Sequence, residues 1–234
     1  MSQKLQASII ITILSVILIN IAILANAQQV FHAWARDGVI DVVGAKSNAI
    51  VRILSLYPTQ NNGIATQVGL YYYDPGRQDS IWFLIGFIRH IRNGNLGPFN
   101  LYGEYKFWGK DASYAFTNPG NMSTYYELEV ILFIGYTANY AKFRVNGDTM
   151  ASIPLPNPEY LEYEYIAIVH AESESENNWL KVDYTSLRHT RTPEGMGSIP
   201  NWVAWVDPVR LGADDNLYVI IISDDYIRIT QNLW

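Results

Sequence analysis

Cysteine is missing from the 234-residue sequence, so no disulfide can stabilise the folded chain. Small exported domains commonly depend on disulfides because their cores are small. A chain of this length has enough residues to bury a sizeable hydrophobic core instead. We therefore expect a fold that is stabilised by its core and by hydrogen bonds.

Charged residues are scarce, at 16% of the chain, and the 16 Lys and Arg are outnumbered by 22 Asp and Glu. The basic residues occur singly and form no stripe, which excludes an extended surface for nucleic-acid phosphates. Aromatic residues make up 14% of the chain and include 17 Tyr and 7 Trp. Tyr and Trp combine an apolar ring with a polar tip and suit ligand stacking.

Several common catalytic and metal-binding signals are also absent. The sequence has no G-x-S-x-G motif, no phosphate-binding Gly loop and no Cys/His pair. The spacing of its four histidines predicts no zinc site, and we expect no cofactor. Acidic pairs such as Asp214-Asp215 fit either a calcium-bound loop or a solvated turn, and we favour the turn.

The first 27 residues have the features of an export signal. Lys4 precedes the apolar run 7–25, and the small-residue triplet Ala25-Asn26-Ala27 fits a signal-peptidase site. The run is also long enough for an uncleaved anchor helix, which would be the chain's one contact with a membrane. We predict a signal or anchor at 1–27, a single domain at 28–234, and a secreted or cell-surface location.

Beyond this segment, short extended runs alternate with turn residues, and no helical periodicity of 3.6 residues is seen. Turns are predicted at Asp74-Pro75-Gly76 and Asn93-Gly94. The run 80–88 is apolar on both faces and predicts a central strand. The pattern predicts an all-β fold, an antiparallel two-sheet β-sandwich, and we expect 154–158 to cross between the sheets.

Asn146-Gly147 is the clearest local signal, since this dipeptide suits a type I′ hairpin turn. The turn predicts that Val145 pairs with Asp148, Arg144 with Thr149 and Phe143 with Met150. A sequon at Asn121 lies in a predicted turn and could carry a glycan.

Alternation along two strands groups polar residues on one side of each. Gln67, Gly69, Tyr71 and Tyr73 share one face of the run 64–73. Glu127 and Glu129 share one face of the run 125–133. Their spacing would allow either an acid/base pair or an ordinary solvated face.

The second half of the chain resembles the concanavalin-A-like jelly rolls, the lectin and glucanase superfold. The resemblance rests on the VNG hairpin, the proline-bearing crossover, and the HAESE and LKVDYTSLR stretches. It implies a jelly-roll arrangement of the predicted sandwich.

A further resemblance is to the glutamic peptidases, the eqolisins, and rests on ATQVGLYYYD followed by SIWFLIGF. It implies that Gln67 stands at the catalytic glutamine and Trp82 at the cleft tryptophan. The stretch YIAIVH places Ile166 where the family has its catalytic glutamate. Glu164, two residues earlier on the same strand face, is the carboxylate that a register slip would restore.

Three functions remain open at the level of sequence. We favour carbohydrate binding on a concave sheet by Gln67, Tyr71, Tyr73, Trp82, Glu127 and Glu129. The enzymatic alternative is a peptidase acting at acidic pH, with Glu164 as general base and Gln67 as oxyanion partner. The third is a surface or filament subunit, a homo-oligomer in which residues 28–37 add to a neighbour's sheet, although we favour closure of the chain's own sheet.

Overall fold

The computed structural model describes residues 30–214 and 216–232. The predicted signal or anchor at 1–27 lies outside these residues. In the described part of the chain, no helix is long and apolar enough to span a membrane.

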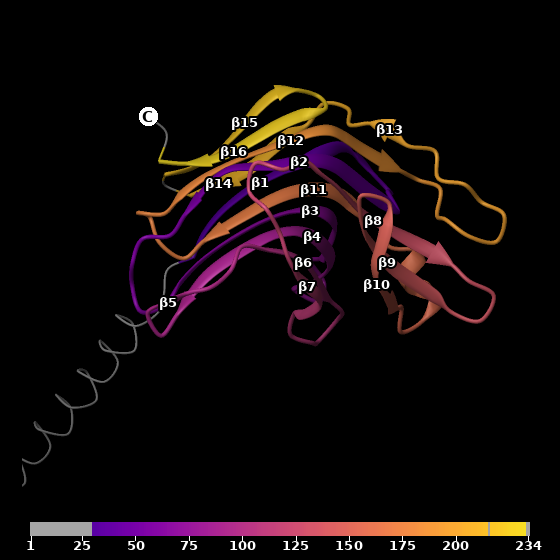
Figure 1. Cartoon of the computed structure of the whole chain (residues 1–234). Helices are drawn as coiled ribbons and strands as arrows, with labels where there is room; N and C mark the ends of the chain where they lie inside the picture. Colours follow the sequence, from indigo (N-terminus) through magenta and orange to yellow (C-terminus); the bar gives the residue numbers. More distant parts are fainter. Residues whose placement is uncertain (1–29, 215, 233–234) are drawn as a thin grey trace, which may run out of the picture. The chain divides into compact units, whose positions relative to one another are not determined.

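Two antiparallel sheets make up the fold (Figure 1), which confirms the predicted all-β sandwich. The first sheet has the order β14-β1-β11-β3-β4-β6-β7, and β5 pairs with β4. Its strands are β1 (Phe31–Ile40), β3 (Asn62–Asp74), β4 (Asp79–Arg92), β5 (Asn95–Leu96), β6 (Asn100–Lys106), β7 (Ser113–Pro119), β11 (Ile166–Ser173) and β14 (Val209–Ala213).

The second sheet has the order β10-β9-β8-β2-β12-β16-β15, and β13 pairs with β12. Its strands are β2 (Gly44–Ser55), β8 (Tyr126–Ile134), β9 (Asn139–Val145), β10 (Asp148–Pro154), β12 (Trp179–Thr190), β13 (Val203–Ala204), β15 (Leu217–Ser223) and β16 (Tyr226–Gln231). The predicted crossover is confirmed, because residues 154–158 and the short 3-10 helix η1 (Pro158–Leu161) connect β10 of this sheet to β11 of the first.

The core lies between the sheets and is built by alternation along each strand. Val68 and Leu70 of β3 and Val169 of β11 are fully buried in it. The hydroxyls of Thr66 and Tyr184 lie 2.7 Å apart and connect the two sheets through the core. The alternating residues of β3 and β11 therefore point to the opposite side of the first sheet.

That opposite side is called the hollow face here: the outer side of the first sheet, which bears His32, Gln67, Trp82, Glu104 and His170. The long strands β3, β4 and β11 arch (Figure 1). The predicted central strand is confirmed, since β4 lies between β3 and β6 and most of its residues are buried. A ligand on the hollow face would cross several strands.

The hairpin at Asn146-Gly147 forms as predicted at its turn. Both residues have positive φ, 53° and 85°, and the pairs Val145–Asp148 and Arg144–Thr149 are present. The third predicted pair is wrong, because Phe143 pairs with Ala151. A bulge at Met150 shifts the register by one residue.

The aromatic segment at the start of the described chain is used within its own sheet. Strand β1 pairs with β11 on one side and with β14 on the other. Within residues 28–37, the segment of the filament hypothesis, Ala33–Arg36 are therefore already paired on both edges.

Candidate functional site

Gln67 occupies the centre of the hollow face. It lies on β3 and is 1% exposed. Its register partners are His170 on β11 and Gly86 on β4, and Gly86 in turn lies opposite Tyr102 on β6. Because Gly86 has no side chain, the amide of Gln67 can reach across β4 to the next strand.

Three neighbours fix the amide group of Gln67. Its Nε2 donates to Glu104 Oε1 at 2.9 Å and also contacts the Tyr102 hydroxyl. Its Oε1 lies 2.9 Å from Nδ1 of His170. Glu104, Gln67 and His170 thus form a polar row across β6, β3 and β11, with both ends of the amide engaged.

Glu104 has a carboxyl group that is poised to exchange a proton near neutral pH. Burial and the nearby charge of Glu172 raise its pKa to about 7, against a partial opposing effect of the hydrogen bond from Gln67. The carboxyl groups of Glu104 and Glu172 line a cavity of about 130 Å³, together with Ala65 and Tyr114. This combination of a perturbed carboxyl and a cavity is typical of functional sites.

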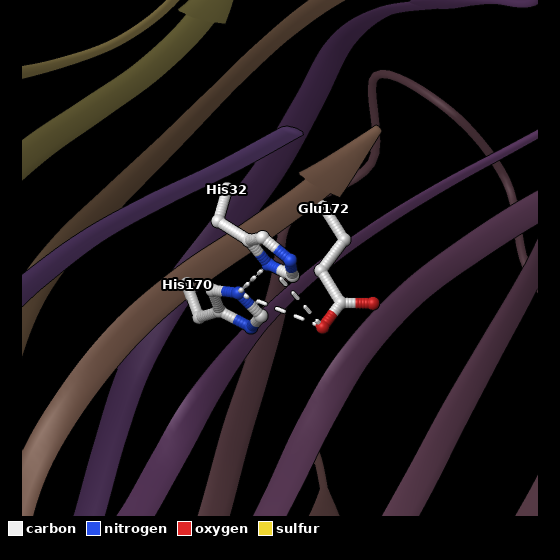
Figure 2. Close-up of side chains that lie close together, drawn as sticks. All are labelled: His32, His170 and Glu172. Atoms are coloured by element: carbon white, nitrogen blue, oxygen red, sulfur yellow. Dashed lines mark hydrogen bonds and ion pairs between the residues drawn. The ribbon is translucent and has the colours of Figure 1, made fainter. Parts of the chain in front are cut away.

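A second cluster adjoins the polar row and contains His32, His170 and Glu172 (Figure 2). His32 Nδ1 lies 3.3 Å from His170 Nε2, and Glu172 Oε1 lies 3.7 Å from each of these nitrogens. Glu172 is two residues from His170 on the same side of β11, and His32 is the register partner of Glu172 on β1. Two neighbouring strands therefore bring the three side chains together.

Burial shifts the pKa of two residues of this cluster, His170 and Glu172. The pKa of His170 is held well below its usual range by burial and by His32, so its ring is neutral at neutral pH. Burial also raises the pKa of Glu172, with a smaller opposing effect of His32.

An apolar hollow lies farther along the same face. It has a volume of about 230 Å³ and is lined by Trp34, Tyr71, Ile168 and Leu211. Trp34 packs edge-on against Tyr71, with ring centroids 5.5 Å apart, and stacks on His170 at 3.8 Å. The hollow is thus next to the polar cluster.

The six residues predicted to bind carbohydrate do not form one site. Gln67, Tyr71, Tyr73 and Trp82 lie on the hollow face, as the alternation predicted. Glu127 and Glu129 lie on β8 in the second sheet, on the opposite side of the sandwich. The alternation of polar and apolar residues shows which face of a strand a side chain occupies, but it does not show to which sheet the strand belongs.

Two of the six residues, Glu129 and Trp82, contact basic side chains of the protein itself. Glu129 is buried and accepts a hydrogen bond from Arg144 at 2.7 Å. The indole ring of Trp82 lies beneath Lys106 Nζ, 5.0 Å from the ring centre. Tyr73 is 49% exposed, and the sequon residue Asn121 is exposed as well.

Glu164 does not lie beside Gln67. Glu164 is exposed and precedes β11, whereas Ile166 pairs with Tyr71 and the residue opposite Gln67 is His170. The two-residue slip that was expected to restore a carboxylate is absent. The carboxylate that Gln67 contacts is Glu104, from a strand on its other side.

The residues that sequence analysis did not select are Glu104, Glu172, His170 and His32. One local signal was available, since His170 and Glu172 alternate on one strand face in the HAESE stretch. His32 lies 138 residues from His170 in the chain, so its approach depends on strand order alone.

Comparison with solved structures shows a likeness in fold to a scytalido-glutamic peptidase, determined with a transition state analog inhibitor. The TM-score is 0.52 at 10% sequence identity, and the match covers 86% of this chain and 97% of the other. No protein-family model matches the sequence, and no curated protein matches it. The protein is thus an antiparallel β-sandwich with the fold of a glutamic peptidase, in agreement with the resemblance seen in its sequence.

Proposed function

We propose that the hollow face is the site of an acid–base hydrolase that cleaves peptide bonds, with Glu104 as the group that transfers the proton. The observation that carries the proposal is the placement of Glu104. Its carboxyl lines a cavity beside a second carboxyl, Glu172, and is held by the amide of Gln67. The pKa of about 7 allows the group to accept and return a proton near neutral pH.

In the proposed reaction, ionised Glu104 removes a proton from a water molecule whose oxygen bonds to the carbonyl carbon of the substrate. The carbon–nitrogen bond then breaks, and the proton passes from Glu104 to the departing amine. Gln67 is 1% exposed, so we assign it to positioning Glu104 rather than to contact with substrate. This assignment replaces the predicted pair Gln67 and Glu164.

The substrate class is supported by the likeness in fold to a glutamic peptidase. The hollow formed by Trp34 and Tyr71 lies on the same face and suits an apolar side chain of an extended peptide. The pKa of Glu104 moves the expected activity from acidic to near-neutral pH, because a general base must be ionised.

Casein digestion from about pH 5 to about pH 9 tests this proposal. Activity of the wild type should rise as the pH approaches about 7, and Glu104→Gln should reduce the rate by roughly 100-fold or more. Glu127→Gln, an equivalent change on the other sheet, is the matched control and should leave the rate unchanged. Full activity in Glu104→Gln would refute the assignment.

A second candidate function is carbohydrate binding, and the apolar hollow favours it. Trp34 and Tyr71 present aromatic rings on which the apolar face of a sugar can stack. A glycan array should then show binding by the wild type that Tyr71→Ala weakens. An array without a signal above background would remove this candidate. Either function would operate outside the cell if residues 1–27 act as predicted.

A further inference from the structure

We propose that His32, His170 and Glu172 bind one divalent transition-metal ion of the zinc type. The inference adds an ion to the face that the proposed function uses, but it does not require peptide hydrolysis. Two imidazoles with one carboxylate are a ligand set that suits zinc and neighbouring transition metals, whereas calcium and magnesium prefer oxygen ligands alone.

The distances between the three ligand atoms fit a small tetrahedral ion. Nitrogen and oxygen ligands lie about 2.1 Å from zinc, so two ligands of a tetrahedral site are roughly 3.4 Å apart. In the structure the nitrogens of His32 and His170 are separated by 3.3 Å, and Glu172 Oε1 lies 3.7 Å from each (Figure 2). Shifts of a few tenths of an ångström would complete the site.

The polar row prepares His170 as a ligand. Gln67 directs its amide nitrogen to Glu104, so the oxygen that faces His170 can only accept a hydrogen bond. Nδ1 of His170 therefore carries the proton, and in a neutral ring Nε2 has a free lone pair. Nε2 is the atom that faces His32 and Glu172. A hydrogen bond to the far nitrogen of a histidine commonly orients it for metal binding.

An ion can reach the cluster from solvent. The side chains of His32 and Glu172 are 40% and 41% exposed, while His170 is buried below them. Three protein ligands leave a fourth position for water, as in catalytic zinc sites. Glu172 also lines the cavity that contains Glu104, so the ion would lie at the edge of that cavity and lower the pKa of a bound water.

The competing explanation is a hydrogen-bonded group without an ion. His32 Nδ1 can donate to His170 Nε2 at 3.3 Å, and a protonated His32 would pair with Glu172. The two explanations differ in one measurable property, which is stoichiometric uptake of zinc by the folded protein.

Isothermal titration of the chelator-treated protein with zinc chloride tests the inference, and circular dichroism monitors folding of each variant. The wild type should bind one zinc ion per chain. His32→Ala and Glu172→Gln should each weaken binding by roughly 100-fold, and Gln67→Leu by about 10- to 100-fold, through loss of the hydrogen bond that orients His170. His90→Ala, which changes a histidine lining the same cavity outside the cluster, is the control and should bind as tightly as the wild type.

No saturable zinc binding by the folded wild type would overturn the inference, as would equal affinity in wild type, His32→Ala and Glu172→Gln. Weakening by His90→Ala alone would move the ion away from the proposed ligands and overturn it too. Zinc binding without casein digestion would support the metal site and refute the hydrolase. Digestion that is lost in Glu104→Gln, in a protein that binds no zinc, would support the hydrolase and overturn the metal site.

Discussion

The two outer faces of the sandwich use carboxyl groups in opposite ways. On the second sheet, Asp183 accepts hydrogen bonds from Arg52 at 3.1 Å and from Arg228 at 2.6 Å. Burial alone would raise its pKa, but these bonds from the two arginines lower the pKa below its usual range. On the hollow face, no Lys or Arg among the described residues forms an ion pair with Glu104 or Glu172, and the pKa of each carboxyl is raised.

The difference separates groups that stabilise the fold from groups that cost it stability. A carboxylate that is paired with arginine favours the folded state once it is ionised. A carboxyl that is buried without a cation opposes folding when it ionises, and such groups collect at functional sites. The comparison therefore supports the hollow face as the functional side of the protein, and each side can be tested by replacing a carboxyl with an amide.

The largest effect is expected for Asp183→Asn. The change removes the charge between Arg52 and Arg228, and we expect the free energy of unfolding to fall by about 3 kcal/mol at neutral pH. Because the folded pKa of Asp183 is below its value in the unfolded chain, this stabilisation is present above about pH 4 and is lost as the pH falls further. Urea denaturation at neutral pH measures the loss. An unchanged midpoint would show that the carboxylate of Asp183 does not stabilise the fold, and would contradict the comparison.

Gly86→Ala is expected to have the next largest effect, a loss of about 2–3 kcal/mol. A Cβ at this position would collide with the Thr66 carbonyl oxygen and lie 2.7 Å from the Gln67 Cα. The strands β3 and β4 would have to separate beneath the polar row. Urea denaturation measures the loss, and an accompanying decrease in casein digestion would connect the packing of this glycine to the site.

Glu104→Gln should act in the opposite direction to Asp183→Asn. The pKa of Glu104 rises from 4.5 in the unfolded chain to about 7. The wild type therefore loses stability as the pH rises through this interval, because the folded state must give up a proton that it holds tightly. The shift corresponds to roughly 3 kcal/mol, and we expect about 2 kcal/mol because solvent in the cavity screens the charge. At about pH 8 the variant should be more stable than the wild type by this amount, and equal stability at low pH is the internal control.

The smallest effect is expected for Glu127→Gln, on the outer face of the second sheet. The residue is half-buried beside Lys46 and Arg188 in an open polar hollow. We expect a change of no more than about 0.5 kcal/mol in the free energy of unfolding. A change as large as that of Asp183→Asn would show that the second sheet holds an additional buried charge network.

Local chemistry in the sequence predicted much of the fold. Asn146-Gly147 determined a turn and its first two pairs, because positive φ at both positions leaves few alternatives. The bulge at Met150 lies beyond these two pairs and was not predicted by the turn. Alternation correctly grouped Gln67, Tyr71 and Tyr73 on one face of β3.

The candidate site was predictable only in part, for a topological reason. Gln67 was selected by resemblance, but its partners Glu104 and His170 come from strands on either side whose order the sequence does not state. Glu127 was grouped with Gln67 for the same reason, because the sequence does not state that their strands belong to different sheets. Periodicity determines which way a side chain points relative to the core, and strand order determines what it meets.

The position of β1 has a consequence for the order in which the protein folds. This strand begins at Phe31, yet its two neighbours are β11 and β14, the latter ending at Ala213. During synthesis His32 is made early, but its register partner Glu172 follows only when β11 has been translated. Contacts between such distant segments form slowly because the intervening loop must first be closed. We therefore expect this part of the hollow face to be assembled after the local hairpins, so that chains cut short before residue 166 contain folded hairpins and no completed site.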